Sequence, residues 1–233
     1  MKAKEKNALH LHFLMEDNLS LSKAIRERYE RMFSGVFYDR YVLGLWVRAE
    51  GLVYPGYDNT VPTKAREYVR YYVSIDYGTS NPCSMGLWGL CDGVWYRIKE
   101  FYYSGRDTGL QKTDGEYYDD LVALVDSRPI TAIVIDPSAA SFIALIRRRG
   151  RFRVRPANND VLNGIRATAS TLAARKILIN DCCTSAIAEF GAYSWDERTG
   201  EDRPIKENDH AMDDIRYFVN TVVVGGGGRF ITV

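Results

Sequence analysis

Two apolar runs that each end in an aspartate dominate the pattern of hydrophobic and polar positions. Residues 71–76 and 131–136 are rich in β-branched and aromatic side chains, which predicts two buried strands. A carboxylate at the end of an apolar strand is costly to bury unless a cation meets it, and a metal ion is the usual one. We therefore expect Asp76 and Asp136 to belong to one assembled site. The alternative for each is a turn carboxylate, and Asp136 could also cap the helix that follows.

The rest of residues 64–233 alternates between strand and helix patterns. Two more strands, 84–90 and 94–103, follow the Asp76 strand and are joined by a turn at Asp92-Gly93. After them we expect helices at 117–125, 141–149, 161–176, 184–190 and 209–223, with short strands at 152–154 and 177–179. This order predicts an α/β fold in which helices flank both faces of a mixed sheet. With aspartates ending its first and fourth strands, the layout matches the ribonuclease H-like arrangement by analogy, in which those two strands are neighbours.

Residues 1–63 have a different character. They suggest a short strand at 9–14, whose His10 and His12 we interpret as surface residues, and a helix capped by Ser20 or Ser22 that stops at Gly35. An aromatic-rich stretch and a loop containing Pro55 and Pro62 follow. We place a domain boundary between residues 63 and 64.

The last helix collects a group of polar side chains that could bind metal. At about 100° per residue, its apolar residues share one face, while His210, Asp213, Asp214 and Tyr217 lie on the opposite side. One reading is a solvated face with acids in the first turn, where the helix dipole favours them. The other is a ligand cluster that completes the site of the two strand-end aspartates. Periodicity does not choose between Asp213 and Asp214.

Composition sets limits on these readings. The chain has 233 residues, 46% hydrophobic and 26% charged, and a net charge of +1, so any nucleic-acid surface must be local. No apolar run is long enough to cross a bilayer. The 4 cysteines lack C-x-x-C spacing, which argues against a zinc site and favours a reducing cytosol.

One local basic surface is visible in the sequence. Three arginines end the helix at 141–149, and three more alternate along the strand that follows, where they would share a face. Such a track suits contact with the phosphates of double-stranded DNA. The alternatives are a helix-dipole complement and a strand edge protected against aggregation. The candidates for DNA contact are Arg147, Arg148, Arg149, Arg151, Arg153, Arg155, Arg203 and Lys206.

Three acidic positions at element ends fit two-metal hydrolysis of a phosphodiester. That chemistry needs oxygen ligands which hold two divalent cations, one to activate water and one to steady the leaving oxygen. Carboxylates are the natural ligands for Mg2+ or Mn2+. Asp76 would bridge both ions, Asp136 would complete one, and the late helix would complete the other.

The sequence resembles the C-terminal nuclease domain of the large terminase subunit of tailed bacteriophages. The segments that carry the resemblance are Val73–Gly78, Ile133–Pro137, Tyr193–Asp196 and Lys206–Asp213, with Met15–Asn18 and Gly44–Gly51 similar to the end of the family's ATPase part and its linker. The family often has a small residue after the last aspartate, where this chain has Asp214.

The resemblance implies a metal-dependent endonuclease that cuts concatemeric viral DNA during genome packaging. It selects Asp213 over Asp214 and places His210 beside the metals. It also implies double-stranded DNA, an ATPase domain of the same protein, the small terminase subunit and the capsid portal as partners, in the host cell cytoplasm. No G-x-x-x-x-G-K-S/T run occurs, so we expect no nucleotide here, and residues after Gly225 should form a flexible tail.

Three other functions remain open on the sequence. A resolvase or transposase of the same fold would use the same chemistry. Residues 75–80 resemble the D-x-G-T-S/T phosphate loop of sugar kinases, although one chain of this length cannot supply both halves of that fold. A DNA-binding module without catalysis is the third.

Overall fold

The computed structural model describes residues 11–33, 35–79, 81–198 and 201–225. Within them, seven strands form one sheet in the order β1-β7-β4-β3-β2-β5-β6. The strands are β1 (Thr60–Val61), β2 (Arg70–Asp76), β3 (Cys83–Cys91), β4 (Val94–Tyr103), β5 (Ile130–Ile135), β6 (Val154–Pro156) and β7 (Ile177–Asn180). The helices are η2 (Met15–Asp17), α1 (Lys23–Met32), α2 (Val36–Tyr41), α3 (Gly105–Thr108), α4 (Asp114–Val125), α5 (Ala140–Arg149), α6 (Val161–Ala173), α7 (Thr184–Phe190), α8 (His210–Phe218) and the π-helical η3 (Val219–Val224).

The sheet is mixed, as predicted. Strands β2, β3 and β4 form an antiparallel meander, and Asp92 and Gly93 make its second turn with positive φ angles. Strand β5 lies beside β2 and runs parallel to it, with Ile75 opposite Ile135. Asp76 and Asp136 each come directly after these paired residues, so both leave the sheet at the same edge.

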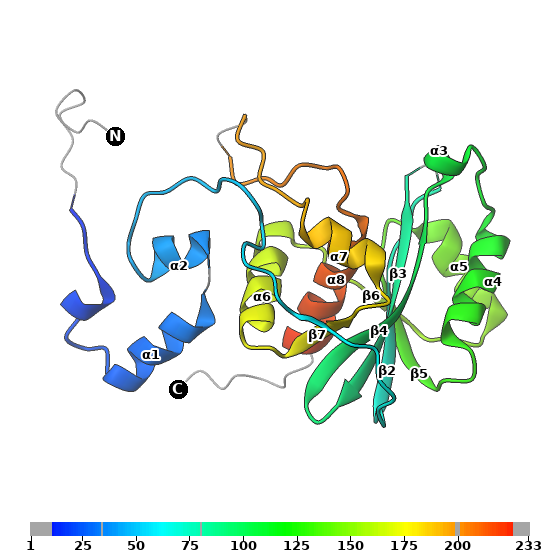
Figure 1. Ribbon diagram of the computed structural model, residues 1–233, viewed down its shortest axis with the longest axis horizontal. Helices are drawn as coiled ribbons and strands as arrows, with labels where there is room; N and C mark the ends of the chain where they lie inside the picture. Colours follow the sequence, from blue (N-terminus) through cyan, green and yellow to red (C-terminus); the bar gives the residue numbers. More distant parts are fainter. Residues whose placement is uncertain (1–10, 34, 80, 199–200, 226–233) are drawn as a thin grey trace.

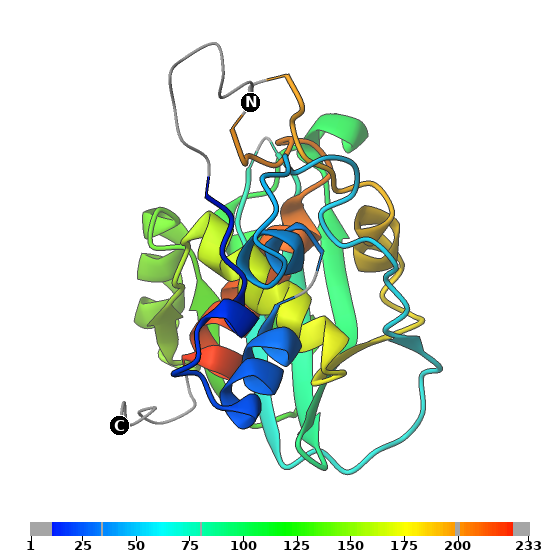
Figure 2. The ribbon, with the colours of Figure 1, turned by 90° about the vertical axis from the view of Figure 1, so that its left-hand side faces the viewer.

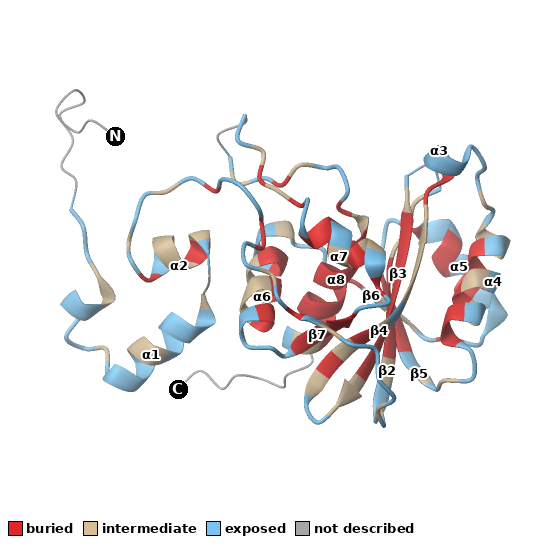
Figure 3. Ribbon diagram, viewed as in Figure 1, coloured by how far each residue is buried: buried red, intermediate tan, exposed pale blue. Residues whose placement is uncertain are grey.

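Helices cover both faces of the sheet (Figure 1). Helices α6, α7 and α8 lie on one face, and α4 and α5 lie on the other. Each face has its own hydrophobic core, and buried residues follow the sheet and α8 in Figure 3. The predicted α/β class with helices on both faces is therefore confirmed.

Helix α8 is buried all the way round, so the expectation of a solvated face is wrong. Its apolar side packs on the sheet, where the Phe218 ring stacks on Trp88 with centroids 4.2 Å apart. Asp213, Asp214 and Tyr217, on the side expected to meet water, are also buried. Other elements of the fold supply partners for these polar groups, which sequence periodicity cannot show. Truncation of an aromatic ring at such a position typically costs about 3–5 kcal/mol.

Most other helices match their predicted ranges, with differences at the ends. Helix α4 starts three residues earlier than expected, because Thr113 and Glu116 form a capping box. Helix α6 ends at Ala173 rather than residue 176, and Arg175 just beyond it has a positive φ of 50°. Residues 193–203 also carry the sequence pattern of a hairpin with its turn at Thr199-Gly200, and Trp195 bridges Pro204 in the antiparallel fashion that this hairpin requires. The turn itself lies outside the described residues.

The N-terminal segment packs against α6 (Figure 2). Helix α1 is capped by Ser22, as predicted, and the carbonyl of Met32 at its end accepts a hydrogen bond from Ser170 of α6. The strand expected at 9–14 is wrong for residues 11–14, where His12 Nε2 instead lies 3.1 Å from the Leu43 carbonyl oxygen. His10 and the tail beyond Gly225 lie outside the described residues.

Strand β1 pairs with β7, so the chain before residue 64 contributes to the same sheet. Val53 and Tyr54 also join the core on the α8 face. The domain boundary at 63/64 stays a prediction.

Candidate active site

Asp76 and His210 form the centre of the candidate site. Asp76 ends β2, and His210 begins α8, which packs along the sheet face from that end toward Trp88. The His210 Nδ1 atom lies 2.8 Å from Asp76 Oδ2, and the Asp76 carboxylate accepts this bond. Burial raises the pKa of Asp76 to about 6, and the negative charge of Asp213 adds to the increase. Burial lowers the pKa of His210, but the bond to Asp76 outweighs it, so that pKa ends above its ordinary value.

Asp136 lies just past the end of β5, in a turn. Its Oδ1 atom accepts a bond of 2.7 Å from the Ser138 backbone N–H, and its Oδ2 atom accepts one of 3.0 Å from Asn159 Nδ2. Burial raises the pKa of Asp136, but hydrogen bonds from Ser138 and Asn159 outweigh it and hold that pKa below its ordinary value. The turn-forming role considered from the sequence is thus real, and it leaves the carboxylate ionised at neutral pH.

Asp213, one turn after His210, is held by two cations. Arg216 Nη2 lies 2.8 Å from Asp213 Oδ1, and Lys206 Nζ lies 3.3 Å from Asp213 Oδ2. Arg216 also donates to the backbone carbonyl of Asn159 over 2.9 Å. Because the side chain of Asn159 holds Asp136, this residue links Asp213 to Asp136 through Arg216.

Asp214 occupies a different environment from its neighbour. Its side chain is 0% exposed and accepts a bond of 3.0 Å from Arg97 Nη2 of β4. The hydroxyls of Ser74 and Ser84 donate to it as well. Gly86 leaves the space for this ion pair, since a Cβ there would collide with the Arg97 guanidinium. Asp214 therefore faces the sheet interior, whereas Asp213 faces the cleft.

A cleft of about 490 Å³ contains three of the four candidate catalytic residues. Asp76, His210, Asp213 and Lys206 line it, together with Arg106 of α3, but Asp136 does not. Sequence reasoning missed Arg106, which donates to Asn81 Oδ1 over 3.0 Å at the cleft rim. It also missed Arg216, for which the i+3 spacing from Asp213 was the available signal.

Helix α8 is fixed at its start by a carboxylate from α7. Glu189 Oε2 accepts the backbone N–H groups of Ala211 and Met212 over 2.7 and 3.1 Å. Asp209 is the N-cap residue but makes no side-chain capping bond, and its Oδ2 lies 3.2 Å from Lys206 Nζ. Glu189, rather than the N-cap residue itself, therefore accepts the free backbone N–H groups at the start of α8.

The arginine track is not the strand face that the sequence predicted. Strand β6 begins at Val154, so Arg155 alone of the three alternating arginines lies on it. Gly150 ends α5 in the left-handed conformation, and Arg151 turns to donate to the carbonyl of Asp126 over 2.6 Å.

The other basic candidates lie on both sides of the site. Because Asp126 precedes β5 and Asp136 follows it, Arg151 lies about 20 Å from the cleft, at the opposite end of the strand. The exposed residues Arg147, Arg148 and Arg149 end α5 on that same side. Lys206 lies at the cleft, and Arg203 is exposed in the segment that leads to it.

The donors of the site suit a hard divalent cation. Carboxylate oxygens are the ligands that Mg2+ and Mn2+ prefer. Nevertheless, in the ranges that the structure describes, no group of three or more His, Cys, Asp and Glu side chains is arranged to hold a metal ion. Each carboxylate is bonded instead to a histidine, an amide or a cationic side chain. Metal binding would therefore require some of these bonds to be exchanged.

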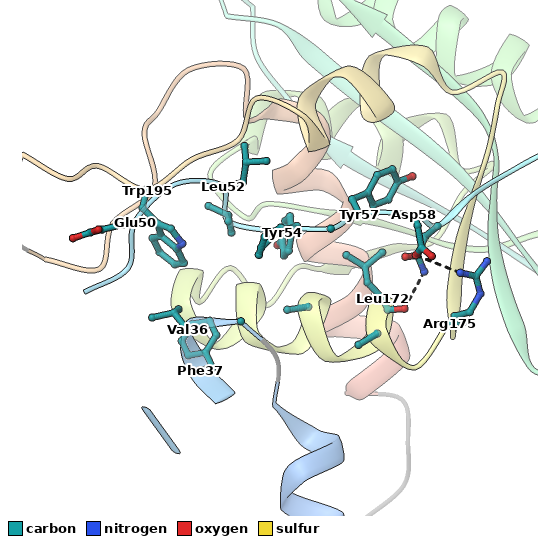
Figure 4. Close-up of a pocket in the computed structure, with 17 residues that line it drawn as sticks. Val36, Phe37, Glu50, Leu52, Tyr54, Tyr57, Asp58, Leu172, Arg175 and Trp195 are labelled. Carbon is teal, nitrogen blue, oxygen red and sulfur yellow. Dashed lines mark hydrogen bonds and ion pairs between the residues drawn. The ribbon is translucent and has the colours of Figure 1, made fainter. Parts of the chain in front are cut away.

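A second pocket, of about 300 Å³, is separate from this site (Figure 4). Tyr54, Tyr57 and Trp195 line it together with Leu172 of α6, and Arg175 pairs with Asp58 at 3.3 Å. No candidate site residue lines it. Among the described helices, none is long and apolar enough to cross a membrane.

Two terminases are similar to this chain in sequence, although no protein-family model matches it. The large terminase from a thermophilic bacteriophage, solved with ADP, is 54% identical over 95% of this chain and 57% of that chain, with a TM-score of 0.88. The terminase large subunit of Escherichia phage T5 is 23% identical over 159 residues, which are 66% of this chain and 35% of that protein. This chain thus spans only part of each relative's length.

Two separately solved nuclease domains share the fold. The P22 large terminase nuclease domain has a TM-score of 0.60 at 14% identity, covering 74% of this chain and 93% of that chain. The nuclease domain of the SPP1 large terminase, solved with bound Mn, has a TM-score of 0.50 at 18% identity, covering 69% of this chain and 95% of that chain. These matches confirm the predicted ribonuclease H-like fold.

Proposed function

We propose, from the premise that this chain is a relative of the large terminase subunits of tailed bacteriophages, that it is a divalent-metal-dependent DNA endonuclease. Its task would be to cut concatemeric viral DNA during genome packaging. The relationship itself rests on the 54% identity with the large terminase of the thermophilic bacteriophage. The nuclease assignment rests on the fold and on the site described above.

One observation carries the proposal. The parallel neighbours β2 and β5 deliver Asp76 and Asp136 to the same edge of the sheet, and α8 brings Asp213 and His210 to that edge. Three separate elements thus bring carboxylates to one end of the sheet, where Asp76 and Asp213 line the cleft, and a catalytic metal site requires such a convergence. A purely structural role for Asp76 would not explain why it is buried beside a second carboxylate.

Asp76 would hold both divalent cations, Asp136 would complete one of the two positions, and Asp213 with His210 would complete the other. The cations would supply an activated water and stabilise the leaving oxygen of the phosphodiester. Mn2+ and Mg2+ are the candidates, and the SPP1 nuclease domain was solved with bound Mn. We select Asp213 rather than Asp214 because Asp213 lines the cleft, whereas the side chain of Asp214 is 0% exposed and pairs with Arg97 in the interior.

The remaining side chains position the substrate and the ligands. Arg216 orients Asp213, and Asn159 orients Asp136. Because His210 Nδ1 bonds to Asp76, its Nε2 atom is the ring nitrogen left for the second cation or, in place of that role, for a proton at the attacked phosphate. Arg106 and Lys206, at the cleft, would bind DNA phosphates without reading sequence.

The wider context is also part of the proposal. The large terminase of the thermophilic bacteriophage was solved with ADP, and this chain covers 57% of it, which supports an ATPase domain as a partner in the same protein. The small terminase subunit, the capsid portal and double-stranded DNA would be further partners, in the host cell cytoplasm.

Cleavage of supercoiled plasmid DNA tests this function. The chain should nick plasmid with Mn2+, and EDTA should stop the reaction. Asp76→Asn should abolish nicking, whereas Asp119→Asn on the exposed side of α4 should leave it unchanged. Near wild-type nicking by the Asp76→Asn variant would show that the site is misplaced.

A further inference from the structure

Lys206 is held between two carboxylates at the cleft. Its Nζ atom lies between two carboxylates, 3.2 Å from Asp209 Oδ2 and 3.3 Å from Asp213 Oδ2. The side chain lines the same cleft as Asp76 and His210. The ammonium group thus neutralises the oxygen of Asp213 that faces the cleft, while Arg216 holds the other oxygen.

The two cations on Asp213 differ in how firmly they are held. The Arg216 side chain is 2% exposed, donates to the Asn159 carbonyl as well, and packs its stem against Gly164 of α6. The Lys206 side chain is 52% exposed and comes from a segment without regular secondary structure. Arg216 is therefore fixed, and Lys206 can leave at little cost in packing.

The charges of the site favour an exchange of cations. The cleft is lined by the cations Arg106 and Lys206 and the His210 ring against five carboxylates, which leaves an excess of negative charge; the carboxylates are Asp76, Asp107, Glu207, Asp209 and Asp213. A lysine ammonium is a compact charge on a flexible stem, and it can stand between two carboxylates much as a metal ion does. The ammonium group of Lys206 does not contact Asp76, whereas a divalent cation could bind Asp76 and Asp213 together.

We infer that Lys206 is a resident cation that keeps the Asp213 position of the site closed and gives way to a divalent ion. This inference rests on the proposed function and goes beyond it, because it makes Lys206 a competitor of the metal before it becomes a contact for DNA. The displaced ammonium stays within reach of the cleft, where a DNA phosphate replaces its two carboxylate partners. Loading of this position is thereby coupled to the presence of DNA.

Titration of the metal itself, without DNA, tests the inference. Calorimetry with Mn2+ should give an affinity about fivefold higher for Lys206→Met than for the wild-type chain, because a half-exposed ion pair no longer competes. The matched control is Lys112→Met, whose lysine pairs with Asp120 outside the cleft and whose loss should leave Mn2+ affinity unchanged. The rise in melting temperature on addition of Mn2+ should likewise be larger for Lys206→Met.

Each outcome has a definite meaning. Equal or weaker Mn2+ binding by Lys206→Met than by the wild-type chain would overturn the role of Lys206 and leave the nuclease proposal standing. Absence of Mn2+ binding to both proteins would overturn the metal site itself, and the inference with it. Tighter binding by both Lys206→Met and Lys112→Met would show a general charge effect and would also overturn the specific role.

Discussion

The buried ion pair between Asp214 and Arg97 makes a strong prediction about stability. Both side chains are 0% exposed, and they join α8 to β4 across 117 residues of sequence. Asp214→Ala would leave the Arg97 guanidinium buried without its main partner, since the remaining contact to Glu100 is at 3.4 Å. Breaking such a pair typically costs about 3–5 kcal/mol of unfolding free energy.

That loss is large compared with the stability of the whole chain. The free energy of unfolding of a domain is about 5–15 kcal/mol, so the variant would keep only part of its stability. For a domain of this size, the melting temperature should fall by roughly 10–15 °C. Chemical denaturation of Asp214→Ala beside the wild-type chain measures the loss directly. The control is Asp120→Ala, which breaks a pair with Lys112 whose side chains are 25% and 24% exposed, and this change should cost less than about 1 kcal/mol.

A double variant separates the ion pair from simple loss of packing. Arg97→Met with Asp214→Asn removes both charges and keeps an acceptor for Ser74 and Ser84, so most of the stability should return. At a temperature where it is folded, this variant should also retain metal-dependent cleavage. The reasoning is refuted if Asp214→Ala costs less than about 1 kcal/mol, or if the double variant is as unstable as the single one.

Three further predictions concern the cleft. At saturating Mn2+, Asp213→Ala should lose plasmid cleavage and His210→Ala should retain part of it, since water can replace an imidazole; full activity of Asp213→Ala would contradict the ligand assignment. Burial raises the pKa of Asp76 to about 6, so the folded chain keeps a proton that the unfolded chain releases between about pH 4 and 6. The unfolding free energy of the metal-free chain should therefore fall as pH rises through that window. In denaturant titrations, this decrease should be smaller by roughly 2 kcal/mol in Asp76→Asn. The same decrease in both proteins would refute the role of Asp76. Arg106→Gln should reduce the slope of DNA affinity against salt concentration by about one phosphate contact. Arg151→Gln should leave that slope unchanged, because the Arg151 guanidinium bonds to the Asp126 carbonyl. The reverse result would place the DNA at the other end of the sheet.

Local patterns in the sequence were enough to locate the strand ends of the site. Asp76 and Asp136 follow apolar runs, and the parallel pairing of those runs brings both to one edge. The capping serine of α1 and the turn at Asp92-Gly93 were readable for the same reason, because short-range chemistry decides them.

Partners that come from distant segments could not be read in this way. Periodicity places Asp213 and Asp214 on the same polar side of α8, and only the position of Arg97 in β4 sends Asp214 into the core. Alternating arginines suggest a strand, yet Arg151 finds a backbone carbonyl at the end of α4 and β6 starts later. In both cases a tertiary contact outweighs a local preference.

The position of bound metal tests the central claim most directly. Anomalous diffraction from crystals of the chain grown with Mn2+ should show density bounded by Asp76, Asp136 and Asp213, with Lys206 no longer against Asp213. A variant with Asp76→Asn should lose that signal. Mn2+ density confined to other acidic surfaces, with the bonds of Lys206 and Arg216 to Asp213 intact, would contradict the account.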